Sequence, residues 1–189
     1  MIKLTQNEST FCQALAMTSL LSELSGHNFL ESDYYQNLCF SGNNDFIKKI
    51  LKDSGLGNPA TMQMFLYALL VMPKEILDKL DKAYLDKCAN QIDHLVSSKA
   101  TKITTTYNNE QSTNLTSIKF YAHIRNAVSH SKCSYDVVNG ECYVTFKDQL
   151  PRDPQQYCEF TLKTADVGSI LETLQKQLMD FLNTQWKIK

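Results

Sequence analysis

The apolar residues of the chain recur mostly at spacings of three and four, which is the period of an amphipathic helix. This pattern predicts a first helix over about 10–25, capped by Ser9 or Thr10, and a second over about 45–54. The stretch 60–72 is apolar on nearly every side and indicates a central, buried helix. On the apolar side of the first helix we expect Leu15, Met17, Leu20, Leu21 and Leu24.

The middle of the chain combines a helix breaker, a long amphipathic segment and a polar stretch. Pro73 is expected to break or kink the buried helix. Residues 74–96 follow as a long amphipathic helix whose charged face is most simply a solvated surface. Residues 97–113 are rich in Thr and Asn and are expected to form a long polar loop.

The hydrophobic period changes near the end of the chain. A helix over about 114–130 is followed by alternating residues on both sides of Asn139-Gly140, the strongest two-residue signal for a hairpin turn. A third strand is expected over about 157–162, within an insertion spanning about 134–162, and a final helix over about 164–185. The sequence therefore predicts a mainly α protein: one helical-bundle domain spanning 1–189, with a small antiparallel hairpin or three-stranded insertion before the last helix.

Composition narrows the class of protein. The 189 residues include 19 basic and 20 acidic side chains, so the net charge is −1 and the basic face typical of duplex-DNA binding is not indicated. No apolar run approaches the roughly 18 residues of a membrane span, and the first residues do not resemble a signal peptide. The six cysteines have no metal-binding spacing. We therefore expect a cytoplasmic protein with no membrane association, no metal and no cofactor.

Arginine is rare in this chain, and one arginine lies in a polar cluster at the end of a predicted helix. Only Arg125 and Arg152 occur among the 19 basic residues. At about 100° per residue, Asn126 and His130 lie about 40° apart on one helix face, while Arg125 and His130 lie about 140° apart. A guanidinium that binds phosphate, a titratable imidazole and an orienting amide together suit phosphodiester chemistry.

The same residues also have a simpler interpretation. An arginine followed by a histidine at this distance arises readily by chance, so Arg125 can equally pair with a surface carboxylate while His130 merely ends the helix. His123 lies about 200° from Arg125 around the helix and is expected to face a neighbouring helix. Spacing alone leaves these alternatives open.

The segment from Arg125 to His130 resembles the R-x4-6-H signature of the HEPN superfamily, in which a polar residue, often Asn, follows the arginine. The likeness extends over about 60–185, including the strands before the last helix, which are similar to those of plasmid- and defence-associated branches. This resemblance implies a metal-independent endoribonuclease that acts as a homodimer, with RNA cut by 2′-OH attack. Arg125 would hold the scissile phosphate, Asn126 would position the phosphate or the imidazole, and His130 would be the general base or acid.

The resemblance also implies substrate contacts and partners. His123, Ser129 and Lys132 are candidate substrate-binding residues around the motif. A toxin or defence role would bring an antitoxin or another regulatory protein as a partner. Some toxin-type members carry a tyrosine two residues after the motif histidine, and Lys132 occupies that position here. The alternative function is a non-catalytic HEPN-like module that binds a nucleotide or a protein.

Overall fold

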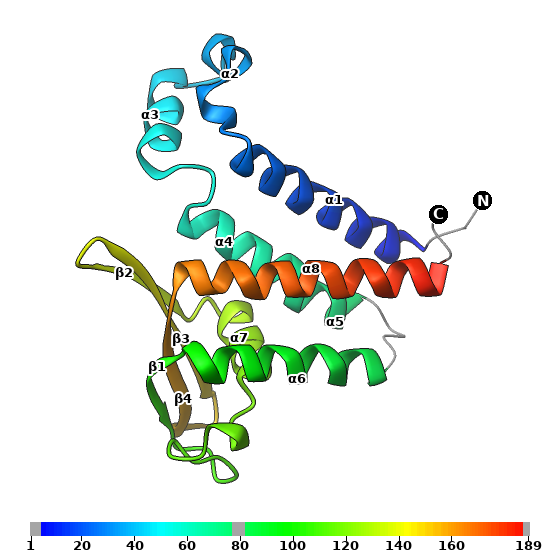
Figure 1. Cartoon of the computed structure of the whole chain (residues 1–189), viewed down its shortest axis with the longest axis vertical. Coiled ribbons are helices and arrows are strands. Elements are labelled where there is room, and N and C mark those ends of the chain that lie inside the picture. The colour runs from blue at the N-terminus through cyan, green and yellow to red at the C-terminus, as the bar shows by residue number, and fades with distance from the viewer. Residues whose placement is uncertain (1–4, 77–81, 187–189) are drawn as a thin grey trace.

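The computed structural model describes residues 5–76 and 82–186 and places an antiparallel sheet at one end of a set of helices (Figure 1). The helices are α1 (Gln6–Gly26), α2 (Asp33–Asn37), α3 (Asn44–Ser54), α4 (Pro59–Leu66), α5 (Met72–Ile76), α6 (Lys82–Lys99), α7 (Phe120–Ser129) and α8 (Thr164–Trp186). Short turns η1 (Phe29–Glu31) and η3 (Leu115–Ser117) and a π-helical segment η2 (Tyr67–Val71) connect them. The strands are β1 (Thr101–Thr105), β2 (Cys133–Val138), β3 (Glu141–Leu150) and β4 (Asp153–Lys163).

The sheet contains the predicted hairpin and extends beyond it. Within the described ranges it has four strands in the order β1-β4-β3-β2, and all neighbouring strands are antiparallel. Asn139 and Gly140 join β2 to β3 with φ values of 54° and 79°, the left-handed conformation that a tight hairpin turn requires. The expected start of the third strand was too late, because β4 begins at Asp153 and already contains Pro154.

The prediction of a polar loop over 97–113 was wrong for 97–105, whereas 106–113 is irregular as expected. Helix α6 continues to Lys99, and β1 then pairs with β4, so that Thr101 lies opposite Thr161. The β-branched threonines suit a strand, and pairing with β4 gives this backbone the hydrogen-bond partners that the sequence pattern did not reveal. The irregular connection instead follows β1, and helix α7 begins at Phe120 and not near Asn114.

Helix α1 begins earlier than expected. Thr5 and not Ser9 or Thr10 caps it: the Thr5 side chain accepts from the Glu8 backbone N–H, and the Glu8 side chain accepts from the Thr5 N–H. This reciprocal pair is a capping box, whose T-x-x-E pattern was present in the sequence. Two residues expected on the apolar side are exposed, Met17 at 55% and Leu20 at 49%. The buried residues of α1 are Phe11, Leu15 and Thr18.

Pro73 does not end the central helix. The chain runs from α4 through η2 into α5, with Pro73 in the first turn of α5. Because proline has no N–H to donate to the preceding turn, a widened π segment directly before it is a physically reasonable accommodation. The buried helix predicted over 60–72 begins at Pro59, and the Asn58 side chain caps it by accepting from the Thr61 N–H. Residues 77–81 of the helix predicted over 74–96 lie outside the described residues.

The core lies where α1, the central α4–η2 segment, α6, α7, α8 and the sheet meet, while α2 and α3 lie far from the sheet (Figure 1). Phe160 of β4 packs against Phe120 of α7 and Phe146 of β3, with ring centroids 4.9 and 5.6 Å apart. The fold class is confirmed as mainly helical with an antiparallel sheet before the final helix. None of the helices in the described ranges is both long enough and apolar enough to cross a bilayer.

Candidate functional site

Helix α7 lies between α6 and strand β3, so one of its faces is buried and the other borders the surface. The buried side consists of Phe120, His123, Ile124, Ala127 and Val128. Arg125 and Asn126 are half-buried, whereas Ser129 and His130 are exposed. The packing of the apolar positions therefore presents the polar cluster at the edge of the fold.

The carboxyl end of α7 is fixed by its own backbone. His130 is the last residue before the turn, and Ser131 adopts a left-handed conformation with φ 53°. The Ser131 N–H donates to the Val128 carbonyl (3.2 Å) and the Lys132 N–H donates to the Ala127 carbonyl (2.8 Å). This pair of bonds is a Schellman motif, and it gives His130 a defined position at the helix end.

A chain of hydrogen bonds connects the predicted motif to the sheet. The Arg125 Nη2 donates to Asn126 Oδ1 at 2.9 Å, and Asn126 Nδ2 donates to Asp148 Oδ2 at 3.0 Å. Asp148 is buried on β3 with 7% of its surface exposed. Because both ends of the Asn126 amide are engaged, its orientation is set by the arginine on one side and the carboxylate on the other.

A pocket of about 340 Å³ borders this chain of bonds. Two of the three predicted catalytic residues, Asn126 and His130, lie on its wall. Arg125 is not one of the lining residues, but it donates a hydrogen bond to Asn126, which is. The lining residues are Asn126, His130, Lys132, Lys147, Asp148, Gln149, Leu150, Pro151 and Pro154. The pocket thus combines an imidazole, two amides and two ammonium groups with the single carboxylate of Asp148. The cationic and amide groups suit an anionic ligand, and Asp148 is engaged by Asn126 and His123.

The predicted substrate-binding residues lie in three different environments. Lys132 lines the pocket beside Lys147, a residue that sequence reasoning had missed. Lys147 also pairs with Glu159 at 3.3 Å and lies over the Tyr157 ring. Ser129 is exposed, and its hydroxyl donates to the Arg125 carbonyl at 2.8 Å. His123 is 5% exposed and lies inside the protein.

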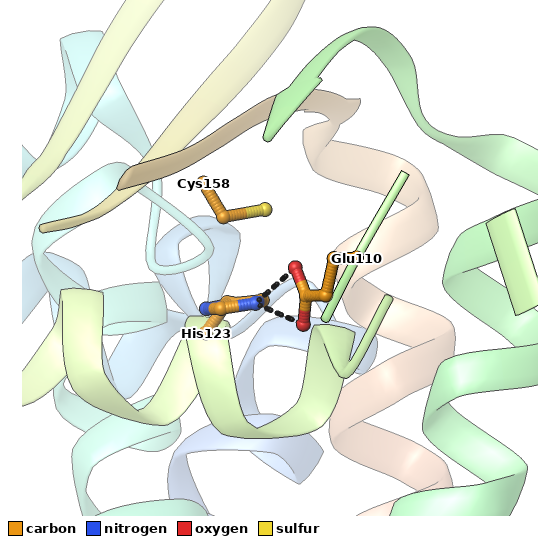
Figure 2. Close-up of side chains that lie close together, drawn as sticks. All are labelled: Glu110, His123 and Cys158. Carbon is orange, nitrogen blue, oxygen red and sulfur yellow. Dashed lines mark hydrogen bonds and ion pairs between the residues drawn. The ribbon is translucent and has the colours of Figure 1, made fainter. Parts of the chain in front are cut away.

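His123 lies between two carboxylates. Its Nδ1 is 2.7 Å from Asp148 Oδ2, and its Nε2 is 2.9 and 3.0 Å from the two carboxylate oxygens of Glu110 (Figure 2). The Tyr107 ring packs against the imidazole with centroids 5.0 Å apart. His123 faces the sheet and the β1–α7 connection, and not the neighbouring helix that its angular position had suggested.

The carboxylates around His123 favour the protonated, imidazolium form of its side chain. Burial by itself would lower the pKa of His123, but its contacts with Asp148, Cys158 and Glu110 outweigh burial and raise the pKa to about 10. Burial would raise the pKa of Asp148, but hydrogen bonds from His123 and Asn126 hold it below its ordinary value. Asp148 therefore stays ionised and anchors both Asn126 and His123.

Sequence reasoning missed Glu110 and Asp148. The sequence could have revealed Asp148, because it lies two residues after Phe146 and four after Val144. All three therefore point to the same buried face of β3. A carboxylate at a buried position requires a partner, so its position predicts a polar contact with the facing helix. Glu110 had no comparable signal, since it lies in an irregular segment whose position depends on tertiary contacts.

A comparison with known protein families identifies the class of protein to which this chain belongs. The family model described as HEPN pEK499 p136 matches residues 2–185, which is nearly the whole chain. The chain therefore belongs to this family of the HEPN superfamily, a group that includes ribonucleases of defence and toxin systems. Searches of curated proteins and of solved structures found no match.

Proposed function

We propose that this protein is a metal-independent endoribonuclease that cuts RNA through attack of the ribose 2′-OH on the adjacent phosphodiester. The observation that carries the proposal is the pocket shared by Asn126 and His130, with Arg125 bound to Asn126 and with Lys132 and Lys147 on the same wall. The chain as a whole has a net charge of −1, so this local gathering of cations is the feature that favours an RNA phosphate.

The proposed reaction uses each group for one role. Arg125, oriented by Asn126, binds a non-bridging phosphate oxygen and stabilises the charge that develops there. His130 accepts the proton of the 2′-OH, and the resulting oxygen bonds to phosphorus while the bond from phosphorus to the 5′-oxygen breaks. The leaving 5′-oxygen takes a proton from a general acid. The products are a 2′,3′-cyclic phosphate end and a 5′-hydroxyl end.

The remaining motif residues have supporting roles in this proposal. Lys132, on the pocket wall, contacts the substrate backbone, and the exposed Ser129 lies one residue before His130. His123 supports the site from inside the protein, because it shares Asp148 with Asn126. A change at His123 is therefore transmitted to the pocket through one carboxylate.

One His130 cannot serve as base and acid at the same moment, so the proposed site is completed by a second copy of the chain. We expect the protein to be a dimer at micromolar concentration, as homodimers are the arrangement that HEPN relatives imply. Light scattering with in-line chromatography measures this directly. A monomer at every concentration that cuts RNA would contradict the composite site while leaving cleavage by a single chain possible.

The proposed function is tested by incubating mixed single-stranded and structured RNA with the full chain in the presence of a chelator. We expect cleavage with cyclic phosphate ends, reduced by about a hundredfold or more in His130→Ala because acid–base catalysis is lost. His27→Ala is a matched control, since His27 is also exposed at the carboxyl end of a helix but lies on α1. Equal cleavage by wild type and His130→Ala would overturn the assignment.

This activity suggests a toxin or defence role in the cytoplasm. In that role an antitoxin or another regulatory protein would keep the ribonuclease inactive. The second candidate is a non-catalytic module that binds a nucleotide or a protein, favoured by the near-neutral charge of the whole chain. Specific binding of RNA or a nucleotide without cleavage, weakened by substitution of Lys132, would support this second function.

A further inference from the structure

A cluster of three different metal-ligand types lies beside the proposed ribonuclease pocket. We propose that Glu110, His123 and Cys158 bind one Zn²⁺ ion. Their side chains come from the β1–α7 connection, from α7 and from β4, and they point toward one another (Figure 2). One donor atom from each residue lies within 4.8 Å of the other two.

These distances are close to those of a bound ion. Zinc bonds of about 2.0–2.3 Å in a tetrahedral arrangement put donor atoms roughly 3.3–3.6 Å apart. The Glu110–His123 contact of 2.9 Å must therefore open slightly, and the widest separation, which is at most 4.8 Å, must close by about 1 Å or less. Shifts of this size are on the scale of side-chain rotation, so the proposed site requires no rearrangement of the fold.

The ligands are oriented by other groups, as is usual in metal sites. The Asp148 carboxylate holds His123 Nδ1 at 2.7 Å, which fixes the proton there and turns Nε2 toward Glu110. Glu110 in turn accepts from the Thr105 hydroxyl at 2.9 Å and from the Lys119 N–H at 3.1 Å. A carboxylate on the non-ligating nitrogen of a metal-binding histidine is the arrangement that raises its basicity as a ligand.

Burial and donor chemistry favour zinc over other ions. The side chains of His123 and Glu110 are 6% and 7% exposed, and Cys158 is fully buried. Imidazole nitrogen and thiolate sulfur beside a single carboxylate suit Zn²⁺, whereas Mg²⁺ and Ca²⁺ prefer sites made of oxygen. A water molecule would supply the fourth position of the tetrahedron.

Charge is conserved when the ion enters. Zn²⁺ replaces the proton on His123 Nε2 and the proton on the Cys158 thiol, so two protons leave as two positive charges arrive. The bound ion would tie the β1–α7 connection to α7 and β4, behind the Asp148 that positions Asn126. No step of the proposed RNA cleavage passes through this ion, so the two proposals can fail separately.

The test uses the full chain, stripped of metal and titrated with Co²⁺, a spectroscopic substitute for zinc. We expect binding of a single equivalent with a sulfur-to-cobalt charge-transfer band, and Zn²⁺ should displace it and raise the melting temperature. Cys158→Ser should lose the band and weaken binding at least tenfold. Glu110→Gln should weaken binding by a similar factor but keep the band, because it leaves the sulfur ligand in place. The exposed Cys142→Ser is the matched control and should behave as wild type.

Three outcomes decide the proposal. Loss of the band in folded Cys158→Ser, with circular dichroism unchanged, supports the site. Absence of cobalt binding to the wild type, or an unchanged band in Cys158→Ser, overturns it and leaves the cluster as a buried ion pair only. His130→Ala should bind Co²⁺ normally while losing RNA cleavage, which separates failure of the metal site from failure of the ribonuclease assignment.

Discussion

Arg125→Ala is expected to reduce RNA cleavage by about a hundredfold or more, because a preorganised group that stabilises transition-state charge typically contributes that much. Arg125 is half-buried and donates to Asn126, so the substitution also frees the amide on one side. The free energy of unfolding should fall by only about 1 kcal/mol, since one hydrogen bond is lost. Single-turnover cleavage and urea denaturation measure the two effects.

Two further variants identify what the arginine supplies. Arg125→Lys keeps the charge but not the planar fork, and it should recover only part of the rate. Arg152→Ala removes the other arginine, which is exposed in the β3–β4 turn, and should change the rate only a few-fold. Wild-type cleavage by Arg125→Ala would exclude its proposed role, and an equal loss in Arg152→Ala would indicate general electrostatic attraction.

His123→Ala is expected to have the largest effect on stability. In metal-free protein the substitution removes the cation between Glu110 and Asp148 and leaves two buried carboxylates without it. Breaking a buried ion pair in this way costs about 3–5 kcal/mol, a large part of the roughly 5–15 kcal/mol that stabilises a typical domain. Urea denaturation in a chelating buffer measures the loss, and His94→Ala, at an exposed position of α6, should change stability by about 0.5 kcal/mol or less.

The same variant predicts how stability depends on pH. Because the pKa of His123 rises from 6.5 to about 10 on folding, its stabilising contribution is complete below about pH 6.5 and is lost as pH rises through about 10. The difference between wild type and His123→Ala should therefore shrink with increasing pH. Adding Glu110→Gln and Asp148→Asn to His123→Ala should restore part of the stability by removing the uncompensated charges. A difference that is small and independent of pH would contradict this account.

The motif helix shows how much the sequence alone predicts. Apolar spacing placed a helix through Arg125, and its angular geometry put Asn126 and His130 on one side, where both line the same pocket. The hairpin at Asn139-Gly140 and the final helix were also predicted, because local turn chemistry and a long apolar stripe specify them. Each of these features is encoded within a few consecutive turns of the chain.

The rest of the site depends on contacts between distant segments. Asp148 reaches Asn126 across 22 positions, and Glu110 reaches His123 across 13. Strand β1 escaped prediction for the same reason, since its threonines become a strand only by pairing with β4. Local periodicity carries no information on such pairings, so the groups that orient the motif are visible only after folding.

The order of the elements along the chain has a consequence for the protein during its synthesis. During translation the motif helix leaves the ribosome before β3 and β4, which carry Asp148 and Cys158. Strand β1 likewise waits for β4, a partner more than fifty residues later, as the pairing of Thr101 with Thr161 shows. Contacts between such distant segments form late, because the intervening chain must first be ordered. A nascent or truncated chain that ends before residue 148 would thus hold the complete Arg125–His130 motif without the carboxylate that orients it, so the proposed activity would begin only after β3 has been synthesised.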